Sequence, residues 1–310
     1  MYSVDGVFKK LTRLKENLQD LTEEEAYGIF ADILEGKLSD VKISAFLTAM
    51  RIKGETGEEL LGVFRSIREK MEFPPQKPEA LDLALNYDGK NRTLYILPSA
   101  LWLCSKLGLD FTNHFALRTP TKEGVTLYEV VSALGVELNV HFCDQRDYAP
   151  ALHDLMPLRR ELGFRSLINT VEKFLNPFGT KRVVVSIFHK PYFEKNAELL
   201  ELLGFEDYTI IKGLEGGIEP LPDRPTYIKR KGEELESVSP GELGLAMPRS
   251  VHTDNVLEDS VELNRRIIEG EERGEFFNWA VYTAGVLLYS HGRCTSVKEG
   301  VELVLKDTSL

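Results

Sequence analysis

The feature that most constrains the fold is a change of hydrophobic periodicity at a proline-rich segment, FPPQKP, at residues 73–78. Before it, apolar side chains recur at the three- and four-residue spacing of amphipathic helices. Thr22 and Glu25 have the spacing of a capping box that opens one of them. Because proline lacks a backbone donor and clashes with the preceding turn, the segment cannot continue a helix. The sequence therefore predicts a helical domain over residues 1–78 and a second domain over residues 79–310.

Beyond residue 78, strand patterns alternate with helical spacing. Strands are expected near 81–85, 109–115, 182–189 and 207–213, the last two being continuous apolar runs typical of buried strands. Helices are expected at about 95–107, 127–135, 191–204, 258–269, 274–290 and 297–307. This alternation indicates βαβ units and a parallel sheet. Residues 148–176 are helical again, and these helices are candidates to pack back on the first domain.

The net charge is −11, from 38 Lys and Arg residues against 49 Asp and Glu residues. Such a balance argues against general adhesion to DNA or anionic membranes. The charge is uneven, however: residues 145–195 carry nine basic and five acidic side chains, and residues 254–275 carry eight acidic side chains and three arginines. A dimer could therefore line a groove with the basic segment and contact nucleic acid. The alternative is that these charges form solvated helix faces.

Cysteine usage and the N-terminus indicate a cytoplasmic protein without a membrane partner. The three cysteines, Cys104, Cys143 and Cys294, lie far apart, so they suggest neither a disulfide framework nor a zinc site. The N-terminal residues mix charges with apolar side chains and lack the apolar core of a signal peptide. The apolar run at 279–290 is shorter than the roughly 18–20 residues that span a bilayer.

Four segments, in order, resemble the anthranilate phosphoribosyltransferases of glycosyltransferase family 3. They are residues 21–56 (LTEEEAYGIF…RIKGET), 148–192 (YAPALHD…HKPY), 212–222 (KGLEGGIEPLP), and the pair 239–245 and 296–304 (SPGELGL and SVKEGVELV). The resemblance implies a small helical domain beside a larger, doubly wound, mostly parallel α/β domain, usually as a homodimer. It also implies a transferase of tryptophan biosynthesis that uses phosphoribosyl diphosphate and Mg²⁺.

This chain has only part of the family's diphosphate cradle. The family places a GTGGDG loop after a strand, and residues 84–89 here read ALNYDG, so only Asp88 and Gly89 match. Glycines let the backbone approach a phosphate closely, and larger side chains do not. The family's Asn-Ile-Ser-Thr motif falls on residues 95–98, YILP, which lack the serine and threonine hydroxyls. Two phosphate-binding elements are therefore missing.

The metal and acceptor motifs are reduced as well. The family's adjacent Asp-Glu pair corresponds to Ile218 and Glu219, which leaves Glu219 as the candidate metal ligand. His114 matches the histidine of the family's KHGNR motif, and Arg118 lies nearby at an uncertain register. Arg165 matches the arginine that contacts the anthranilate carboxylate in the family. Each candidate also has a purely structural interpretation. Asp88 and Gly89 could form a turn, His114 could be a hydrogen-bonded structural residue, Arg165 could pair with Glu161 or cap a helix, and Glu219 could be a solvated loop residue.

Two functions therefore remain open. The first is a phosphoribosyltransferase-like enzyme with an altered substrate, since the missing elements argue against the standard activity. It would bind the phosphate and ribose through Asp88, Gly89, Lys90, Asn91, His114 and Arg118, the acceptor through Arg165 and Mg²⁺ through Glu219, with no catalytic residue assigned; the side chains of Lys90 and Arg92 could replace lost amides. The second follows a divergent branch of the family that is associated with nucleic acid. In it, a non-catalytic homodimer binds through Arg146, Arg159, Arg160, Lys173, Lys181, Arg182 and Lys190.

Overall fold

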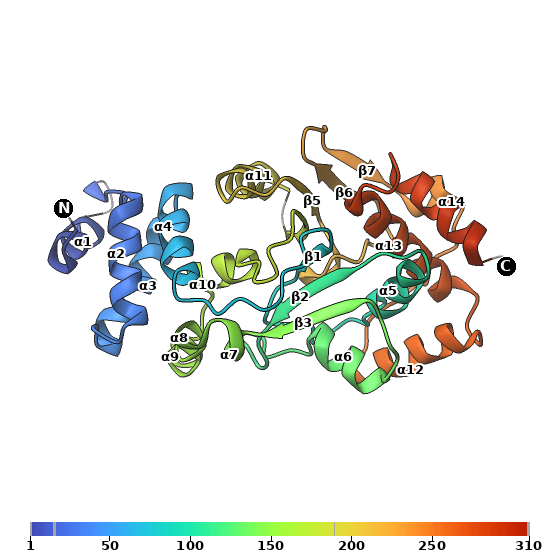
Figure 1. Ribbon diagram of the computed structural model, residues 1–310, viewed down its shortest axis with the longest axis horizontal. Coiled ribbons are helices and arrows are strands. Elements are labelled where there is room, and N and C mark those ends of the chain that lie inside the picture. The colour runs from blue at the N-terminus through green and yellow to red at the C-terminus, as the bar shows by residue number, and fades with distance from the viewer. Residues whose placement is uncertain (1, 15–16, 189, 309–310) are drawn as a thin grey trace.

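The structure is a computed structural model that describes residues 2–14, 17–188 and 190–308. Figure 1 shows an elongated molecule with the N-terminal helices at one end and the C-terminal helices at the other. Within the described ranges, none of the helices combines the length and apolarity needed to cross a membrane.

The described residues before the proline-rich segment form four α-helices, as their spacing predicts. These are α1 (Val4–Leu11), α2 (Glu23–Leu34), α3 (Asp40–Lys53) and α4 (Gly57–Arg68). The capping box is present: the Thr22 hydroxyl accepts from the Glu25 backbone, and the Glu25 carboxylate accepts from the Thr22 backbone. It satisfies N–H groups that the first helical turn leaves unpaired. Phe30 and Phe46 are fully buried in the core of this bundle.

The rest of the chain contains a seven-stranded sheet with the order β3-β2-β1-β4-β5-β6-β7. The strands are β1 (Leu81–Ala84), β2 (Phe111–Phe115), β3 (Val140–Asp144), β4 (Arg182–Ser186), β5 (Asp207–Ile211), β6 (Thr226–Arg230) and β7 (Glu236–Val238). The first five are parallel, β6 is antiparallel to β5, and β7 is antiparallel to β6. A helical part followed by a mostly parallel α/β sheet is therefore confirmed. Strands β3, β6 and β7 were not predicted, β4 ends before the predicted run does, and residue 189 of that run lies outside the described residues.

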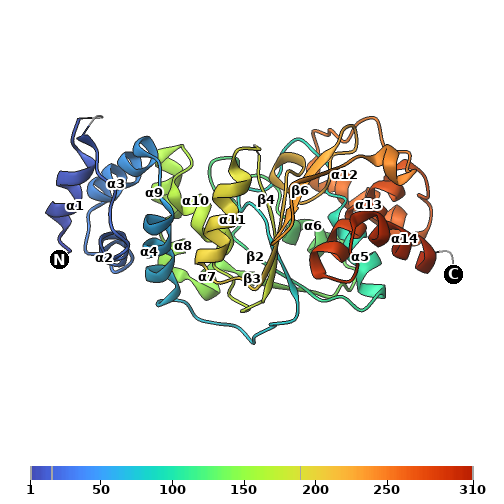
Figure 2. The same cartoon turned by 90° about the horizontal axis from the view of Figure 1, so that it is seen from above.

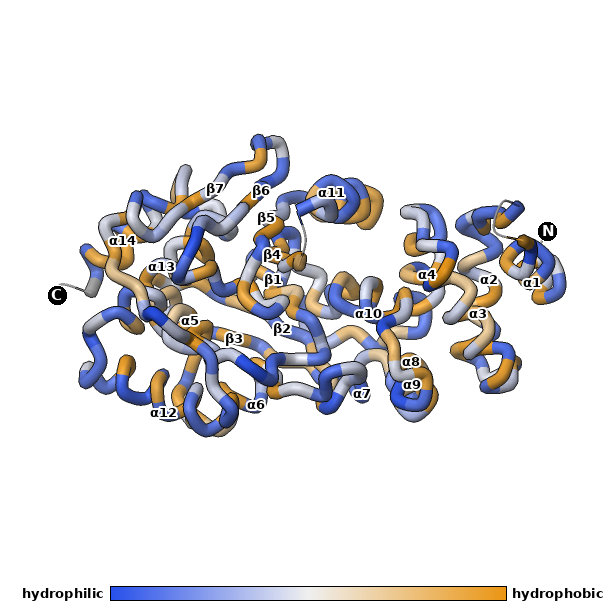
Figure 3. The backbone as a smooth tube through the Cα atoms, turned by 180° about the vertical axis from the view of Figure 1, so that it is seen from behind, coloured by the Kyte–Doolittle hydropathy of each residue, from blue (hydrophilic) through white to orange (hydrophobic). Residues whose placement is uncertain are grey.

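Helices cover both faces of the sheet (Figure 2). On one side lie α5 (Leu97–Lys106), α6 (Leu127–Leu134), α12 (Val256–Glu269), α13 (Glu275–His291) and α14 (Val297–Thr308), and on the other lies α11 (Tyr192–Leu202). Strand β4 shows why its sequence is continuously apolar: Val184 packs in the cluster beneath α5 and α13, whereas Val183 and Val185 pack in a second cluster on the opposite face. Figure 3 shows the same hydrophobic character along β4 and β5.

Short helices connect β3 to β4 and contact the N-terminal bundle. They are α7 (Gln145–Tyr148), α8 (Pro150–His153), α9 (Met156–Leu162), α10 (Leu167–Val171) and a 3₁₀ turn, Glu172–Phe174. Helix α10 contacts α3 and α4, and α9 contacts α3. Leu167 and Ile168 belong to the same buried cluster as Phe46. We keep residues 1–78 and 79–310 as the proposed domains, which meet at α10.

Candidate functional site

A cleft of about 550 Å³ lies at the carboxyl edge of the parallel strands. The order of the strands reverses between β1 and β4, and open α/β sheets bind ligands at such a point. One wall contains Arg51 and Glu55, from the end of α3 and the turn after it. The other contains Asn86 after β1, Phe188 after β4 and Arg165 before α10.

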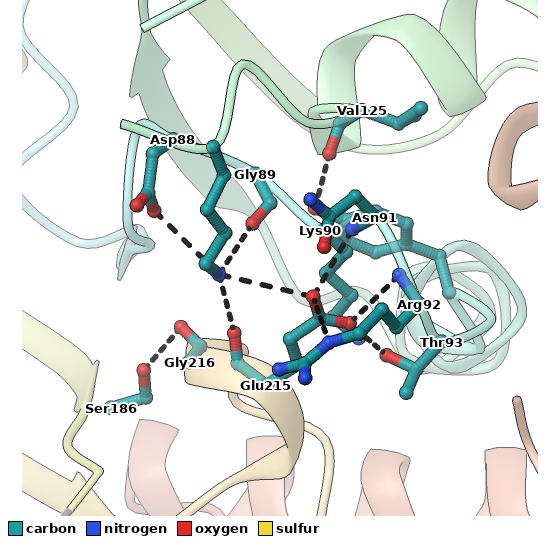
Figure 4. Close-up of polar contacts among 12 residues, drawn as sticks. Asp88, Gly89, Lys90, Asn91, Arg92, Thr93, Val125, Ser186, Glu215 and Gly216 are labelled. Atoms are coloured by element: carbon teal, nitrogen blue, oxygen red, sulfur yellow. Dashed lines mark hydrogen bonds and ion pairs between the residues drawn. The ribbon is translucent and has the colours of Figure 1, made fainter. Parts of the chain in front are cut away.

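Beside the cleft, the loop after β1 forms an anion nest that a side chain of this protein fills. The carboxylate of Glu215 accepts hydrogen bonds from the backbone N–H groups of Asn91 (3.1 Å) and Arg92 (3.3 Å) (Figure 4). It also accepts one from the Thr93 hydroxyl at 2.8 Å. Successive N–H groups of this kind bind phosphates and carboxylates. Burial disfavours the charged form, but the hydrogen bonds and the nearby Lys122 outweigh it and lower the pKa of Glu215.

Two cations hold Asp88, the acidic residue that matches the end of the family's glycine-rich loop. Arg165 donates to the Oδ2 of Asp88 through Nε, at 3.1 Å, and through Nη2. Lys122 donates to the carbonyls of Gly89 (3.0 Å) and Glu215 (3.2 Å), and its Nζ lies 3.8 Å from Oδ1 of Asp88. Burial lowers the pKa of Lys122. The loops after β1, β2 and β5 are therefore joined by these charges.

Lys90 and Glu219 form a buried ion pair below the nest. The Nζ of Lys90 lies 2.7 Å from Oε1 of Glu219, and the two side chains are 2% and 0% exposed. The same ammonium lies 4.3 Å from the ring centre of Tyr95 and donates to the Leu94 carbonyl at 3.3 Å. The other oxygen of Glu219, Oε2, has no hydrogen-bond partner among the described residues. A lysine of this chain thus neutralises the carboxylate that the family resemblance assigns to metal.

The carboxylates around the nest do not fit Mg²⁺, which needs several oxygen ligands in octahedral geometry. Glu219 is bound by Lys90, Asp88 by Arg165, and Glu215 by the loop after β1. In the part of the chain that the structure describes, no group of three or more His, Cys, Asp and Glu side chains could hold a metal ion. The Mg²⁺ site predicted at Glu219 therefore requires Lys90 to move away first.

The backbone conformation of Gly89, which matches the last residue of the family's glycine-rich loop, requires a glycine. Its φ is +64°, and a Cβ there would lie 2.3 Å from the Val125 carbonyl oxygen. By contrast, Leu85 and Tyr87, which stand where the family has other loop residues, are buried in the core. The loop is thus held by side-chain packing instead of being left open for a phosphate.

His114 lies in the interior of the sheet and does not line the cleft. Its Nδ1 is hydrogen-bonded to the Tyr87 hydroxyl, and its Nε2 lies 3.3 Å from Oδ2 of Asp82. The Tyr87 hydroxyl is also hydrogen-bonded to that of Tyr148. All four side chains are buried. This arrangement corresponds to the structural interpretation of His114, as a hydrogen-bonded core group.

Arg118 is also separate from the nest. Its side chain is 59% exposed, lies 3.3 Å from Glu129 and donates to the Glu123 carbonyl. Of the residues predicted on the phosphate, acceptor and metal sides, the structure brings six together: Asp88, Gly89, Lys90, Asn91, Arg165 and Glu219.

The seven cations predicted to contact nucleic acid differ in exposure. Arg159 and Lys173 are buried, and Arg159 donates to both carboxylate oxygens of Glu172 at 2.8 Å. Lys181 and Arg182 are half-buried and pair with Glu79, whereas Arg146, Arg160 and Lys190 are exposed. Nucleic-acid contact stays a prediction, and the three exposed residues are the positions at which to test it.

Sequence reasoning missed Glu215, Lys122 and Thr93. Glu215 has a φ of +51°, a left-handed conformation that no local pattern predicts for glutamate. The available signal was a second carboxylate in a glycine-rich loop, four residues before Glu219.

Two family models match the chain. The helical bundle domain of a glycosyl transferase family matches residues 9–71, and the α/β domain of that family matches residues 127–309. The chain is 73% identical to an uncharacterised protein of Aquifex aeolicus (strain VF5), over 99% of each chain. It is 28% identical to the anthranilate phosphoribosyltransferase of the same organism, over 95% of this chain and 92% of that one.

Solved structures give the same assignment. The anthranilate phosphoribosyltransferase of Thermus thermophilus superposes with a TM-score of 0.78 at 26% identity, over 92% of this chain and 90% of that one. The Saccharomyces cerevisiae enzyme in complex with phosphoribosyl diphosphate and Mg shares the fold, with a TM-score of 0.77 at 17% identity, over 97% and 92% of the two chains. The chain therefore belongs to the glycosyl transferase family of the anthranilate phosphoribosyltransferases.

Proposed function

We propose that this chain binds a small organic anion in its cleft and does not transfer a phosphoribosyl group from phosphoribosyl diphosphate. The observation that carries the proposal is the Glu215 carboxylate in the nest of Asn91, Arg92 and Thr93. A phosphate that bound at this nest would compete with Glu215 for the same N–H groups and would be repelled by the carboxylate. Hydrogen bonds to charged groups contribute about 1.5–3 kcal/mol each, so displacing three of them is costly.

The charge of the cleft supports the binding half of the proposal. Among the described residues, its lining includes four cations, Arg51, Arg165, Lys173 and Lys195, and one acidic side chain, Glu55. A volume of about 550 Å³ is within the range of small-molecule sites. An anion of moderate size therefore fits both the space and the electrostatics.

The relatives in Aquifex aeolicus support the second part of the proposal, that the chain does not transfer a phosphoribosyl group. That organism has an anthranilate phosphoribosyltransferase in addition to the protein that is 73% identical to this chain. A second protein with the pathway activity removes the need for the 73% identical relative to supply it.

The test compares this chain with the Aquifex aeolicus anthranilate phosphoribosyltransferase as a positive control. We expect millimolar phosphoribosyl diphosphate with Mg²⁺ to raise the melting temperature of the control and to leave this chain unchanged. Phosphoribosylanthranilate is expected from the control alone. A saturable stabilisation of this chain, or product formed by it, would contradict the proposal.

We also propose a homodimer formed through α3. Val41 and Ile52 are 78% and 76% exposed, which is unusual for apolar side chains. They lie eleven residues apart, or about three helical turns, so they share one face of the helix. Ala45, which is exposed, and Thr48, which is half-buried, lie between them on that face, so the helix presents an uncharged stripe, and contiguous patches of this kind mark interaction sites.

The nucleic-acid alternative remains a proposal that rests on the exposed Arg146, Arg160 and Lys190. If it holds, an oligonucleotide is retarded in a gel by the wild-type chain and released by moderate salt, because phosphate contacts release counterions. Replacing all three residues with Glu would then abolish the shift. Retardation that survives the triple replacement would rule out these positions.

A further inference from the structure

Within the described part of the chain, Lys173 is a buried cation without a carboxylate partner. Its residue is 8% exposed, and it lines the cleft from the 3₁₀ turn Glu172–Phe174. Its Nζ donates to the Ser186 carbonyl at 3.4 Å and lies 4.9 Å from the Phe174 ring centre. The adjacent Glu172 is already bound by Arg159 through two hydrogen bonds of 2.8 Å. Because an unpaired buried charge is costly, Lys173 points to an anion from outside the chain.

A second donor on the same cleft also lacks a partner. The side-chain nitrogen of Asn86, Nδ2, is buried and has no hydrogen-bond partner among the described residues. Buried amide N–H groups are nearly always hydrogen-bonded, so this one needs an acceptor. An oxyanion in the cleft would supply acceptors for both Asn86 and Lys173.

The number of charges indicates how much negative charge the ligand carries. Of the four described cations that line the cleft, Arg165 pairs with Asp88, and the carboxylate of Glu55 adds one negative charge to the lining. Two positive charges therefore remain for the ligand. The apolar part of the lining consists of Leu60, Ile187, Phe188, Tyr192 and Leu199. A ligand complementary to this surface has a dianionic group attached to an apolar part.

We propose that the cleft binds an organic phosphomonoester whose oxygens accept hydrogen bonds from Lys173 and Asn86. The inference rests on the proposed function and deepens it by naming the class of anion. A phosphomonoester carries close to two negative charges at pH 8, since its second pKa is about 6. A monocarboxylate of the same shape would leave one cation uncompensated.

Binding should be coupled to proton uptake. Burial, with a smaller effect of Arg165, lowers the pKa of Lys173 to about 8, so about half of the amine is neutral at pH 8. The other charged groups that line the cleft around it are Arg51, Glu55 and Lys195. A dianion beside Lys173 favours the ammonium form, so its pKa rises on binding. The complex then takes up about half a proton per site at pH 8 and much less at pH 7.

The test is isothermal titration calorimetry with phenyl phosphate and, as the monoanionic match, benzoate. Titrations in two buffers of different ionisation enthalpy give the number of protons taken up. For the wild-type chain we expect phenyl phosphate to bind at least tenfold more tightly than benzoate, with proton uptake at pH 8. Lys173→Met should weaken phenyl phosphate at least tenfold and remove the proton uptake. The control, Lys298→Met, removes an exposed cation that does not line the cleft and should keep both the affinity and the proton uptake.

Three results would overturn the inference. Benzoate binding as tightly as phenyl phosphate would refute the dianion and leave an anion-binding cleft in place. Phenyl phosphate binding by the wild-type chain without proton uptake anywhere between pH 7 and pH 9.5 would refute the role of Lys173, even if Lys173→Met fails to fold. Binding of neither compound would refute the inference, whereas the transfer assay with phosphoribosyl diphosphate decides independently whether the chain is a transferase.

Discussion

Removing the Glu215 carboxylate should convert the nest after β1 into a binding site for an external anion. In Glu215→Ala, the N–H groups of Asn91 and Arg92 and the hydroxyl of Thr93 lose their acceptor. At the lower limit of about 1.5 kcal/mol for each charge-assisted bond, three bonds supply roughly 4.5 kcal/mol. A dissociation constant of 1 mM corresponds to about 4.1 kcal/mol, so we expect pyrophosphate to bind at about millimolar concentration.

The assay is calorimetric titration of pyrophosphate without Mg²⁺, together with ³¹P line broadening. The wild-type chain should show no binding at 10 mM, because the ligand must first displace Glu215. Asp223→Ala is the matched control: it removes one carboxylate from the same β5–β6 loop, and Asp223 is an exposed residue that does not contact the nest. We expect this control to behave like the wild-type chain.

Equal pyrophosphate binding by the wild-type chain and Glu215→Ala would refute the reasoning, since the carboxylate would then not compete for the nest. Binding by the Asp223→Ala control would show that the loss of any negative charge is sufficient. Failure of Glu215→Ala to bind would mean that the nest closes when the carboxylate is removed. Each of these results separates local geometry from general electrostatics.

Further variants test other features. Lys90→Met should lower the free energy of unfolding by about 3–5 kcal/mol, because it leaves Glu219 charged and buried, and Lys90→Met/Glu219→Leu should recover part of the loss in urea unfolding. Val41→Glu should convert the proposed dimer to a monomer in light scattering, and a chain that is monomeric before the change would count against the interface. Burial raises the pKa of Cys143 to about 11, so iodoacetamide should modify it roughly 100-fold more slowly at pH 7.5 than it modifies an ordinary thiol; rapid labelling of the native chain would contradict this.

The sequence predicts the elements whose residues are uniformly buried. It does not predict the strands in which buried and partly exposed residues are mixed. The three central residues of β4, Val183, Val184 and Val185, are all apolar because both faces of the strand are covered, and their pattern is unambiguous. Strand β3 is an edge strand, and four of its five residues are half-buried, so its residues give no clear period. Strand β6 alternates buried Thr226 and Ile228 with partly exposed neighbours, including two basic residues, so its sequence contains no apolar run that would indicate a strand.

The sequence predicts which residues gather at the site but not the contacts that they make. Family motifs directed attention to Asp88, Arg165 and Glu219, which the structure places around one edge of the sheet. The occupant of the nest could not be predicted, because Glu215 reaches Asn91 across 124 residues of sequence. Long-range pairing of this kind depends on the placement of two loops, and neither loop carries a periodic signal.

The buried cluster on the α11 side of the sheet runs without interruption from Val7 in α1, through Leu167 in α10, to Ile210 in β5. The two walls of the cleft therefore share one hydrophobic core, and opening the cleft would break packed contacts inside it. Because these walls are held in place before a ligand arrives, binding orders little of the protein. The association rate of a ligand should therefore be governed by diffusion and charge. For the same reason, a fragment cut at the proline-rich segment would expose to water the core side chains through which α10 packs against α3 and α4.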